Sequence, residues 1–255
     1  MMQAVAVIPS AGSGRRYGTS AKLWQRLRHV PVLVRTLQQV SRVAAIRDVV
    51  VVTRRGDIAA LRRLLQRYHL RKVRTVVAGG PTRMLSVWRG LQAVDPRWPY
   101  IVIHDGARPL VTPRLLEATL RAAHRTGAAI AAMPATETVK QCAPRAQHVT
   151  TPPRARFWMA QTPQVFRSSL IRRAYAQARR AGLALTDDAA AVERLGHRVT
   201  LVRGEARNLK ITWPHDLRVA QTFVNGHGRP HHLSDPPTAD SKKLSALRAN
   251  RQVVG

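Results

Sequence analysis

The sequence predicts an α/β fold built on a doubly wound, mostly parallel β-sheet. Short continuous runs of Val, Ile and Ala recur along the chain, and stretches with helical spacing of apolar residues lie between them. Continuous apolar runs are typical of strands covered on both faces, and their alternation with helices is typical of parallel sheets. With 255 residues, the chain is long enough to bury a full core in one large domain.

The first half of the chain follows this alternation without interruption. The apolar runs predict strands at Ala4–Ile8, Asp48–Thr53, Val73–Ala78, Tyr100–His104 and Ala128–Met133. Apolar residues three and four positions apart predict helices at Val30–Val43, Ile58–Tyr68, Leu85–Val94 and Pro113–Arg125. Pro31 and Pro113 suit first-turn positions of their helices, and Thr112 is a suitable N-cap.

The alternation ends after Met133. The stretch from Pro134 to Arg156 has several prolines and no helical face, which predicts a disordered loop or an extended arm reaching over another subunit. Regular structure then resumes. We expect helices at Ser168–Arg180, Asp187–Leu195 (capped by Thr186) and Pro214–Phe223, and strands at Val199–Val202 and Leu209–Thr212. Residues 226–255 are polar and rich in Gly, Pro and His, which predicts a mostly disordered tail.

The charge of the chain is strongly positive. Lys and Arg number 43 against 13 Asp and Glu, and the formal net charge is +30. Such a balance favours either a nucleic-acid-binding protein or arginines spread over every solvated face. Because no helix-turn-helix, zinc-finger or aromatic RNA-binding signature accompanies the charge, we favour the second interpretation and expect no specific nucleic-acid partner.

Cysteine content and hydropathy help to predict where in the cell the protein works. Cys142 is the only cysteine, which excludes an internal disulfide, and no Cys/His cluster has metal-ligand spacing. No apolar run is long enough to span a bilayer, and the first residues lack the charged region of a signal peptide. We therefore expect a soluble cytoplasmic protein with no membrane partner.

The loop after the first strand has the composition of a phosphate-binding loop. It carries Gly12, Gly14, Arg15 and Arg16, with Lys22 shortly after. Glycines let backbone N–H groups approach an anion, and the cationic side chains neutralise its charge. The spacing matches neither the dinucleotide fingerprint nor the Walker pattern. We interpret the loop as a triphosphate-binding loop rather than an ordinary tight turn.

A second polar stretch follows the fourth predicted strand, at His104–Pro109. It lies at the carboxyl end of that strand, where ligands bind in open α/β sheets. Asp105 could hold a metal-bound phosphate, and Arg108 could make a bidentate contact to a phosphate. The alternative is an Asp–Arg pair that fixes the turn.

Seven short motifs occur in order along residues 3–224, and together they closely resemble the 2-C-methyl-D-erythritol 4-phosphate cytidylyltransferase family. Each motif alone is weak, but seven in register are specific. They are Ser10-Ala11-Gly12-x-Gly14-x-Arg16, Lys22, Gly79-Gly80-x-x-Arg83-x-x-Ser86-Val87, His104-Asp105-x-Ala107-Arg108-Pro109, Ala160-Gln161-Thr162-Pro163-Gln164-x-Phe166, Thr186-Asp187-Asp188-Ala189 and Gly204-x-x-x-Asn208-x-Lys210-Ile211-Thr212.

The resemblance implies a Rossmann-like nucleotidyltransferase fold at residues 1–225. It implies transfer of a cytidylyl group from CTP to 2-C-methyl-D-erythritol 4-phosphate, with Mg²⁺ or another divalent cation and release of pyrophosphate. A related enzyme acting on another polyol phosphate, such as ribitol 5-phosphate, is the alternative. In this family the segment corresponding to about 135–156 forms an arm that interlocks with a second subunit. We therefore expect a homodimer with composite active sites.

The resemblance also implies roles for individual residues at the nucleotide. Arg16 and Lys22 would contact the CTP phosphates and stabilise the transition state, and Lys210 would bind phosphate beside the reaction centre. The remaining nucleotide contacts would come from Ala11, Gly12, Gly80, Ser86, Asp105 and Gly106, with Asp105 also a candidate metal ligand.

For the second substrate, the resemblance implies contacts from Arg108, Thr138 and Arg154, often across the subunit boundary. The chain departs from the family pattern at Ser10 and Gly106, where the family usually has Ala. It also has Pro81 where an acidic residue near the base is common, so base selectivity is the property most affected. The segment Gln161–Gln164 is open to two interpretations, a turn that shapes the pocket or a direct contact.

Overall fold

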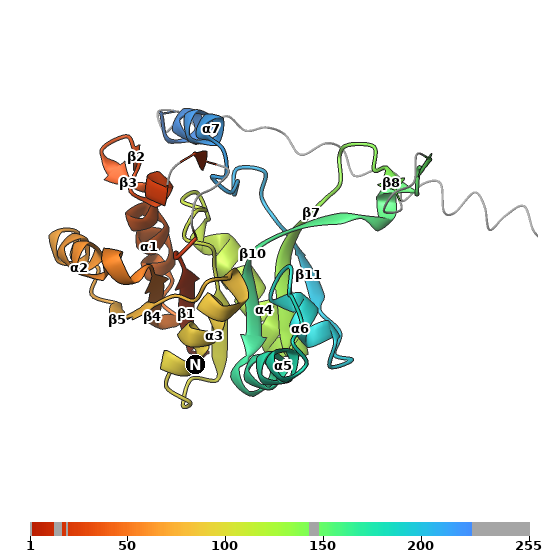
Figure 1. Ribbon diagram of the computed structural model, residues 1–255, viewed down its shortest axis with the longest axis horizontal. Helices are drawn as coiled ribbons and strands as arrows, with labels where there is room; N and C mark the ends of the chain where they lie inside the picture. Colours follow the sequence, from red (N-terminus) through yellow and green to blue (C-terminus); the bar gives the residue numbers. More distant parts are fainter. Residues whose placement is uncertain (1, 13–16, 19, 143–147, 226–255) are drawn as a thin grey trace, which may run out of the picture. The chain divides into compact units, whose positions relative to one another are not determined.

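Seven strands form one central sheet (Figure 1). The structure is a computed structural model that describes residues 2–12, 17–18, 20–142 and 148–225. The strands of the sheet, in the spatial order β11-β7-β10-β6-β1-β4-β5, are Thr200–Arg203, Ala128–Pro134, Trp158–Arg167, Tyr100–Ile103, Ala4–Pro9, Ile46–Thr53 and Val73–Ala78. All neighbours pair in parallel except β10, which is antiparallel to β6 and β7. The predicted doubly wound, mostly parallel sheet is therefore confirmed.

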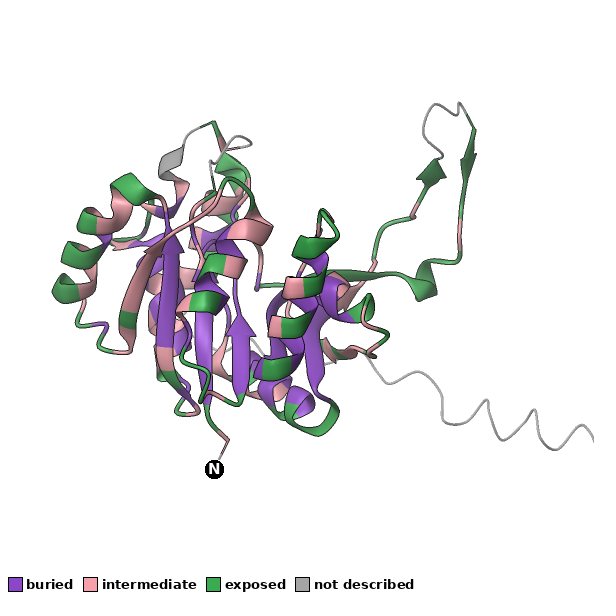
Figure 2. Cartoon of the chain, turned by 60° about the horizontal axis from the view of Figure 1, so that its bottom comes forward, coloured by how far each residue is buried: buried purple, intermediate pink, exposed green. Residues whose placement is uncertain are grey.

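Helices cover both faces of this sheet because its strands are apolar on both sides. Alternate residues of β1 point to opposite cores, with Ala6 and Ile8 in one and Val5 and Val7 in the other. The first core includes residues of α1 (Val32–Arg42), α2 (Ile58–Arg67), α4 (Pro113–Thr126) and α7 (Pro214–Asn225). The second includes residues of α3 (Arg83–Ala93), α5 (Ser168–Arg180) and α6 (Ala189–Glu193). Figure 2 shows the strands buried between these layers.

Local capping chemistry explains where several helices begin. The predicted cap of α4 is confirmed, since the Thr112 side chain accepts a hydrogen bond from the Leu115 amide. The predicted cap of α6 is wrong. Asp187 Oδ1, not Thr186, accepts from the Ala190 amide at 3.0 Å.

The predicted helix at Val30–Val43 begins two residues later than expected. Val30 and Pro31 form the short strand β3 (Val30–Pro31), which pairs with β2 (Arg26–Leu27). Pro31 itself has extended backbone, with ψ 144°, and pairs with Arg26, so the helix starts after it. Two 3₁₀ turns complete this half of the chain, η2 (Ser20–Leu23) and η3 (Arg55–Asp57).

Two strand predictions in the second half need correction. Leu209–Thr212 forms no strand, and the Ile211 amide instead donates to the Ala107 carbonyl at 2.9 Å. Strand β10 has no counterpart in the predictions, because the polar segment Gln161–Gln164 interrupts its apolar pattern. The register with β7 shifts between Ala160 and Gln164, so this segment lies inside a strand and is not a turn between elements.

For the segment between β7 and β10 the sequence leaves two expectations, a disordered loop or an extended arm, and the described part of this segment contains two short strands and a turn. Strands β8 (Gln141–Cys142) and β9 (Val149–Thr150) form a two-stranded antiparallel hairpin, followed by the 3₁₀ turn η4 (Arg154–Arg156). Figure 2 shows this hairpin standing away from the central sheet. Large apolar side chains at its base are open to solvent, with Met159 63% and Trp158 41% exposed. We call residues 135–156 the arm.

Residues Met1–Val224 form one compact unit. The predicted tail at 226–255 lies outside the described residues. Among the helices that the structure describes, none has the length and apolar character needed to cross a bilayer.

Candidate active site

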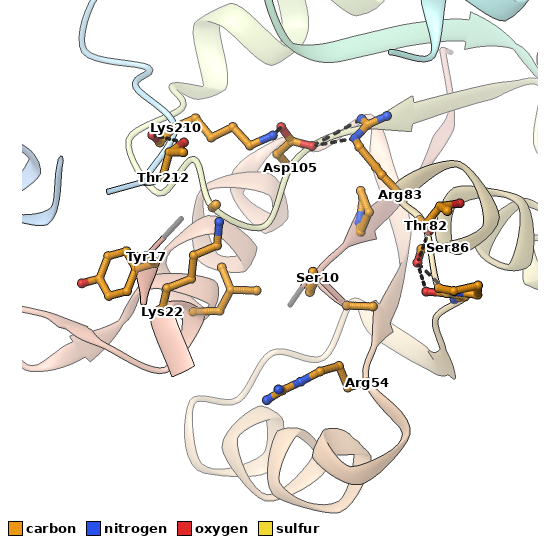
Figure 3. A pocket seen from close by; sticks show the side chains of 17 residues that line it. Ser10, Tyr17, Lys22, Arg54, Thr82, Arg83, Ser86, Asp105, Lys210 and Thr212 are labelled. Carbon is orange, nitrogen blue, oxygen red and sulfur yellow. Dashed lines mark hydrogen bonds and ion pairs between the residues drawn. The ribbon is translucent and has the colours of Figure 1, made fainter. Parts of the chain in front are cut away.

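A cleft of about 600 Å³ opens at the carboxyl ends of β1, β4, β5 and β6 (Figure 3). Seven residues predicted for the nucleotide site line it: Ala11, Gly12, Lys22, Gly80, Ser86, Asp105 and Lys210. Six further polar or charged residues among those described line it without having been assigned a role from the sequence: Ser10, Tyr17, Arg54, Thr82, Arg83 and Thr212. Segments far apart in the sequence thus meet in one cleft.

Asp105 is the centre of a group of charges. Lys210 Nζ lies 2.8 Å from its Oδ2 and Arg83 Nη2 lies 3.3 Å from its Oδ1, while Arg108 Nε lies 3.8 Å from Oδ2. Burial opposes the charge on this carboxyl, but Arg83, Lys210 and Arg108 hold the pKa of Asp105 well below its usual range. Asp105 therefore stays ionised and fixes two of the cations that face the cleft.

Arg83 bridges this cleft to the interior. Its Nη1 and Nη2 donate to the two oxygens of Asp188 at 2.9 and 2.7 Å, a bidentate pair with a carboxylate that has no solvent exposure. The Tyr175 hydroxyl donates to the same carboxylate. Although burial opposes the charge, Asp188 and then Asp105 raise the pKa of Arg83 well above its ordinary value. Arg83 is thus held in a single orientation.

Sequence reasoning missed this bridge. Arg83 and Asp188 both occur in the motifs that carry the family resemblance, but neither residue is assigned a role from the sequence. A signal did exist, because the chain has only 13 acidic residues and two of them, Asp187 and Asp188, are adjacent. Their adjacency in an arginine-rich chain indicates a specific cationic partner.

His104 holds the loop that carries Asp105. The Asp105 amide donates to Thr162 Oγ1 at 3.0 Å, and Thr162 Oγ1 lies 3.0 Å from His104 Nδ1. His104 Nε2 lies 3.3 Å from the Arg108 carbonyl. Burial lowers the pKa of His104 to about 4, so the ring is neutral at physiological pH. The neutral tautomer that fits these partners donates from Nε2 and accepts the Thr162 hydroxyl at Nδ1.

We predict that His104 makes the protein lose stability in mild acid. Its pKa is about 4 in the fold against an ordinary value of 6.5, so between these values the unfolded chain takes up a proton that the folded chain does not. The contribution is fully present above pH 6.5, and on the order of 3 kcal/mol of the unfolding free energy is lost on acidification to pH 4.

Urea unfolding at about pH 7 and pH 5 measures this loss. His104→Asn should give a flatter dependence on pH over that interval. The charged groups facing the ring, Asp105 and Arg108, do not titrate in this window, because the pKa of Asp105 lies far below it. An equal loss in the wild-type protein and the variant would contradict the assignment.

The turn after β5 gives the cleft a wall of main-chain groups. Ser86 Oγ accepts from the Gly80 amide at 3.1 Å and donates to the Thr82 carbonyl at 2.9 Å. A Cβ on Gly79 would lie 2.3 Å from the Ala11 side chain, so this glycine is needed for the close contact between two loops. The result is a polar surface at Gly80 and Ser86 made of main-chain groups and a hydroxyl.

Gly106 does not line the cleft in the way the resemblance implies. Its carbonyl accepts from Thr36 Oγ1 at 2.9 Å, and its amide donates to the Pro9 carbonyl at 3.3 Å. A Cβ here would lie 2.7 Å from Ser10 Oγ. The two departures from the family pattern are therefore linked in space. An alanine methyl at position 106 would collide with the hydroxyl of Ser10, so the serine and the glycine fit together.

Besides Gly106, four predicted residues lie outside the cleft or outside the described chain. Arg108 is buried and its Nη1 donates to the Asn208 carbonyl at 2.7 Å, so it supports the loop of Lys210. Thr138 and Arg154 are exposed in the arm, where Arg154 Nη1 donates to the Thr136 carbonyl at 2.7 Å. Arg16 lies outside the described residues.

The surroundings of Asp105 do not fit a protein-held metal. Asp105 is the only carboxylate among the described residues that line the cleft, and each of its oxygens already faces a cation. In the described part of the chain, no three His, Cys, Asp or Glu side chains come together as a metal site. Asp105 is placed to hold Lys210 and Arg83 rather than to ligate a metal.

Comparisons with known proteins agree with this geometry. Residues 4–226 match the sequence profile of a family described as 2-C-methyl-D-erythritol 4-phosphate cytidylyltransferase. A relative of that name from Symbiobacterium thermophilum is 42% identical over 224 residues, which cover 88% of this chain and 93% of the relative. One from Syntrophotalea carbinolica is 43% identical over 230 residues, 89% of this chain and 98% of the relative. A solved structure of 4-diphosphocytidyl-2C-methyl-D-erythritol synthase from Anaerococcus prevotii has a TM-score of 0.77 and 32% identity, and the match covers 88% of this chain and 96% of that chain.

Proposed function

The chain belongs to the 2-C-methyl-D-erythritol 4-phosphate cytidylyltransferase family, and from this premise we propose that its reaction takes place in the cleft around Asp105. The enzyme transfers a cytidylyl group from CTP to 2-C-methyl-D-erythritol 4-phosphate, giving 4-diphosphocytidyl-2-C-methyl-D-erythritol and pyrophosphate in isoprenoid precursor synthesis. The observation that carries our proposal is the meeting of Lys22, Lys210 and Arg83 with two glycine-containing turns in one cleft.

The chemistry needs positioning and charge stabilisation more than proton transfer. An oxygen of the substrate phosphate attacks the α-phosphorus of CTP, a new P–O bond forms, and the bond to the β-phosphate breaks to release pyrophosphate. The attacking phosphate is already ionised at neutral pH, so no general base is required. Fixed cations that face the α-phosphate lower the energy of its developing charge. We assign this role to Lys22 and Lys210, and to Arg16 in the loop outside the described residues.

We place the cytosine against the uncharged wall at Gly80 and Ser86. A base is recognised by hydrogen bonds to its edge. This wall offers main-chain groups and the hydroxyl of Ser86, which hydrogen bonds to Gly80 and Thr82 hold in place. Pro81, which follows Gly80, has no N–H to offer. Ala11 and Gly12 would line the nucleotide from the opposite loop.

Magnesium fits this proposal as an ion that enters with the nucleotide. The described residues offer it no cage, so we propose that CTP phosphates supply its ligands. When bound there, a divalent cation neutralises part of the triphosphate charge. We also propose that the enzyme works in the cytoplasm, as its sequence predicts.

The arm supports the proposal of a homodimer with composite sites. Thr138 and Arg154 are exposed in the arm, on either side of its hairpin, and not in the cleft of their own chain. Trp158 and Met159, at its base, are exposed apolar side chains of the kind that a partner subunit covers. We propose that the arm of one subunit brings Arg154 to the cleft of the other, where it binds the 4-phosphate of the second substrate.

A mixing experiment tests the composite site. Lys210→Met inactivates one cleft and Arg154→Ala removes the arm contact, so each homodimer should be nearly inactive. If the subunits exchange at random, half of the dimers carry both variants and one of their two sites is intact, giving about a quarter of wild-type activity. Activity no higher than the sum of the separate variants, or gel filtration that shows only active monomer, would exclude this arrangement.

The substrate assignment has a direct assay. Purified protein is incubated with CTP and 2-C-methyl-D-erythritol 4-phosphate, and pyrophosphate release is followed. Ribitol 5-phosphate serves as the alternative acceptor and UTP as the alternative nucleotide. We expect turnover with the first pair and at least about tenfold less kcat/KM with either replacement. Preference for ribitol 5-phosphate would contradict the acceptor assignment.

A further inference from the structure

We propose that Arg54 is an additional ligand of the nucleotide and binds its outer phosphates. The inference rests on the proposed placement of CTP in the cleft and adds a residue to which the sequence motifs assign no role. Arg54 directly follows β4, whose last two carbonyls hold the flanking loops. Val52 O accepts from the Ser10 amide and Thr53 O from the Gly79 amide, each at 2.7 Å. Arg54 therefore begins at the middle of the cleft and lines it.

Within the part of the chain that the structure describes, the guanidinium of Arg54 makes a hydrogen bond through its Nε alone. Its Nε donates to Asp57 Oδ2 at 2.7 Å, and its side chain is 36% exposed. Asp57 lies in η3, three residues on, so the tether is local and does not depend on a bound ligand. Among the described residues, no other group receives a hydrogen bond from Arg54. The two Nη nitrogens, with four N–H groups, are therefore available to a ligand.

The other cations of the cleft are engaged within the protein at their charged ends. Lys22 Nζ donates to the Ile211 carbonyl at 3.2 Å, and Lys210 lies against Asp105. Arg83 is held by two carboxylates. Arg54 differs because Asp57 contacts only its Nε, which leaves the two Nη nitrogens facing away from this partner. A planar fork of N–H donors matches the paired oxygens of a phosphate.

The fold decides which part of the nucleotide Arg54 meets. The segment after Lys22 continues into α1, and the segment after Arg54 continues into α2; Leu37 of α1 and Leu61 of α2 belong to the same core. The segment after Gly80 continues into α3, which packs in the core on the opposite face. Arg54 thus leaves the sheet on the side of Lys22 and away from the base wall. Figure 3 shows its guanidinium directed toward the side on which Lys22 lies.

Position and chemistry together indicate the β- and γ-phosphates as the ligand. The α-phosphate belongs to Lys22 and Lys210 in the proposed mechanism, and the base belongs to the wall at Gly80 and Ser86. The outer phosphates carry most of the remaining charge of CTP. They leave as pyrophosphate, so Arg54 would also bind this product.

Isothermal titration with CTP, CMP and inorganic pyrophosphate tests the assignment. Arg54→Met is expected to weaken CTP and pyrophosphate binding about tenfold or more, as for the loss of a charge-assisted hydrogen bond, and to leave CMP binding within about twofold. Arg55→Met is the matched control, because it removes the same charge from the adjacent, exposed residue, which does not line the cleft. Arg54→Lys keeps the positive charge but lacks the planar pair of Nη donors, and its affinity for CTP and pyrophosphate is expected to lie between those of Arg54→Met and Arg55→Met.

Three outcomes overturn the proposal. Equal effects of Arg54→Met and Arg55→Met would indicate a general charge effect, and an equal loss for CMP and CTP would place Arg54 at the base or ribose. Unchanged CTP binding in folded Arg54→Met, verified by circular dichroism, would remove Arg54 from the site. Failure of the proposed function is distinguished separately, because the wild-type protein would then show no turnover of CTP.

Discussion

Replacing Lys210 by methionine is expected to lower kcat about 100- to 1,000-fold and to change KM for CTP much less. The side chain lies at the edge of the cleft with its Nζ 2.8 Å from Asp105 Oδ2, so its position is fixed before any substrate binds. A fixed cation stabilises charge that develops on the α-phosphate without reorganising during the reaction. Methionine keeps most of the volume of the side chain and removes only the charge and the donors.

Lys72→Met is the matched control for this variant. Lys72 Nζ donates to the Val43 carbonyl at 2.8 Å, it does not line the cleft, and its replacement removes the same formal charge. We expect its kcat to stay within about twofold of wild type, because Lys72 lies outside the cleft and makes no contact with the reacting groups. If Lys210→Met lost less than about tenfold in kcat, or raised only KM, the residue would be a binding group and not a stabiliser of the transition state.

Replacing Asp188 by alanine is expected to destabilise the fold by about 3–5 kcal/mol, the usual result of breaking a buried ion pair from one side. Asp188 has no solvent exposure and accepts hydrogen bonds from both Nη atoms of Arg83. Its loss leaves Arg83 with Asp105 as its one remaining carboxylate partner among the described residues. The Tyr175 hydroxyl, whose pKa is raised by burial and by Asp188, loses its acceptor as well. Urea unfolding followed by circular dichroism measures the change.

A double-mutant cycle separates the ion pair from simple loss of packing. The cycle consists of Arg83→Met, Asp188→Leu and the variant that carries both, and this double variant, which lacks both charges, is expected to be less destabilised than the sum of the two single variants. Tyr175→Phe removes one hydrogen bond to the carboxylate and should reduce the unfolding free energy by about 1.5–3 kcal/mol. If the double variant were as unstable as the sum of its parts, Arg83 and Asp188 would not form a coupled pair in solution.

The parallel half of the fold could be predicted from the sequence because its signals are local. Runs such as Val49–Val52 are apolar without interruption, and helices such as Pro113–Thr126 carry both their cap and their periodicity in a short window. Strand β10 is different. Its polar residues Thr162 and Gln164 are buried and find partners only in the folded protein, where Gln164 contacts Asp187 and the amide of Asp188. No local pattern reports such distant partners.

The residues of the candidate site differ in the same way: local sequence indicates some of them and not others. Lys22 follows a glycine-containing loop, Asp105 follows a strand, and Lys210 belongs to a motif of the family resemblance, so each is visible in the sequence. The structure brings all three into one cleft. The ion pair of Arg83 with Asp188 joins residues 105 positions apart. The adjacent acids indicate a cationic partner, but only the three-dimensional arrangement shows which arginine it is. Arg54 could not be predicted from the sequence either, because one more arginine after a strand does not stand out in a chain with so many arginines.

The placement of β10 has a consequence for synthesis on the ribosome. Strands β6 and β7 both emerge from the exit tunnel before β10, which lies between them and pairs with each. Until residues 158–167 have been translated, Tyr100–Ile103 presents an open strand edge made entirely of apolar residues. We expect the nascent chain to be most prone to aggregation and to chaperone capture in that interval. A ribosome-stalled series ending before and after β10 would show protease resistance rising once this strand has cleared the tunnel.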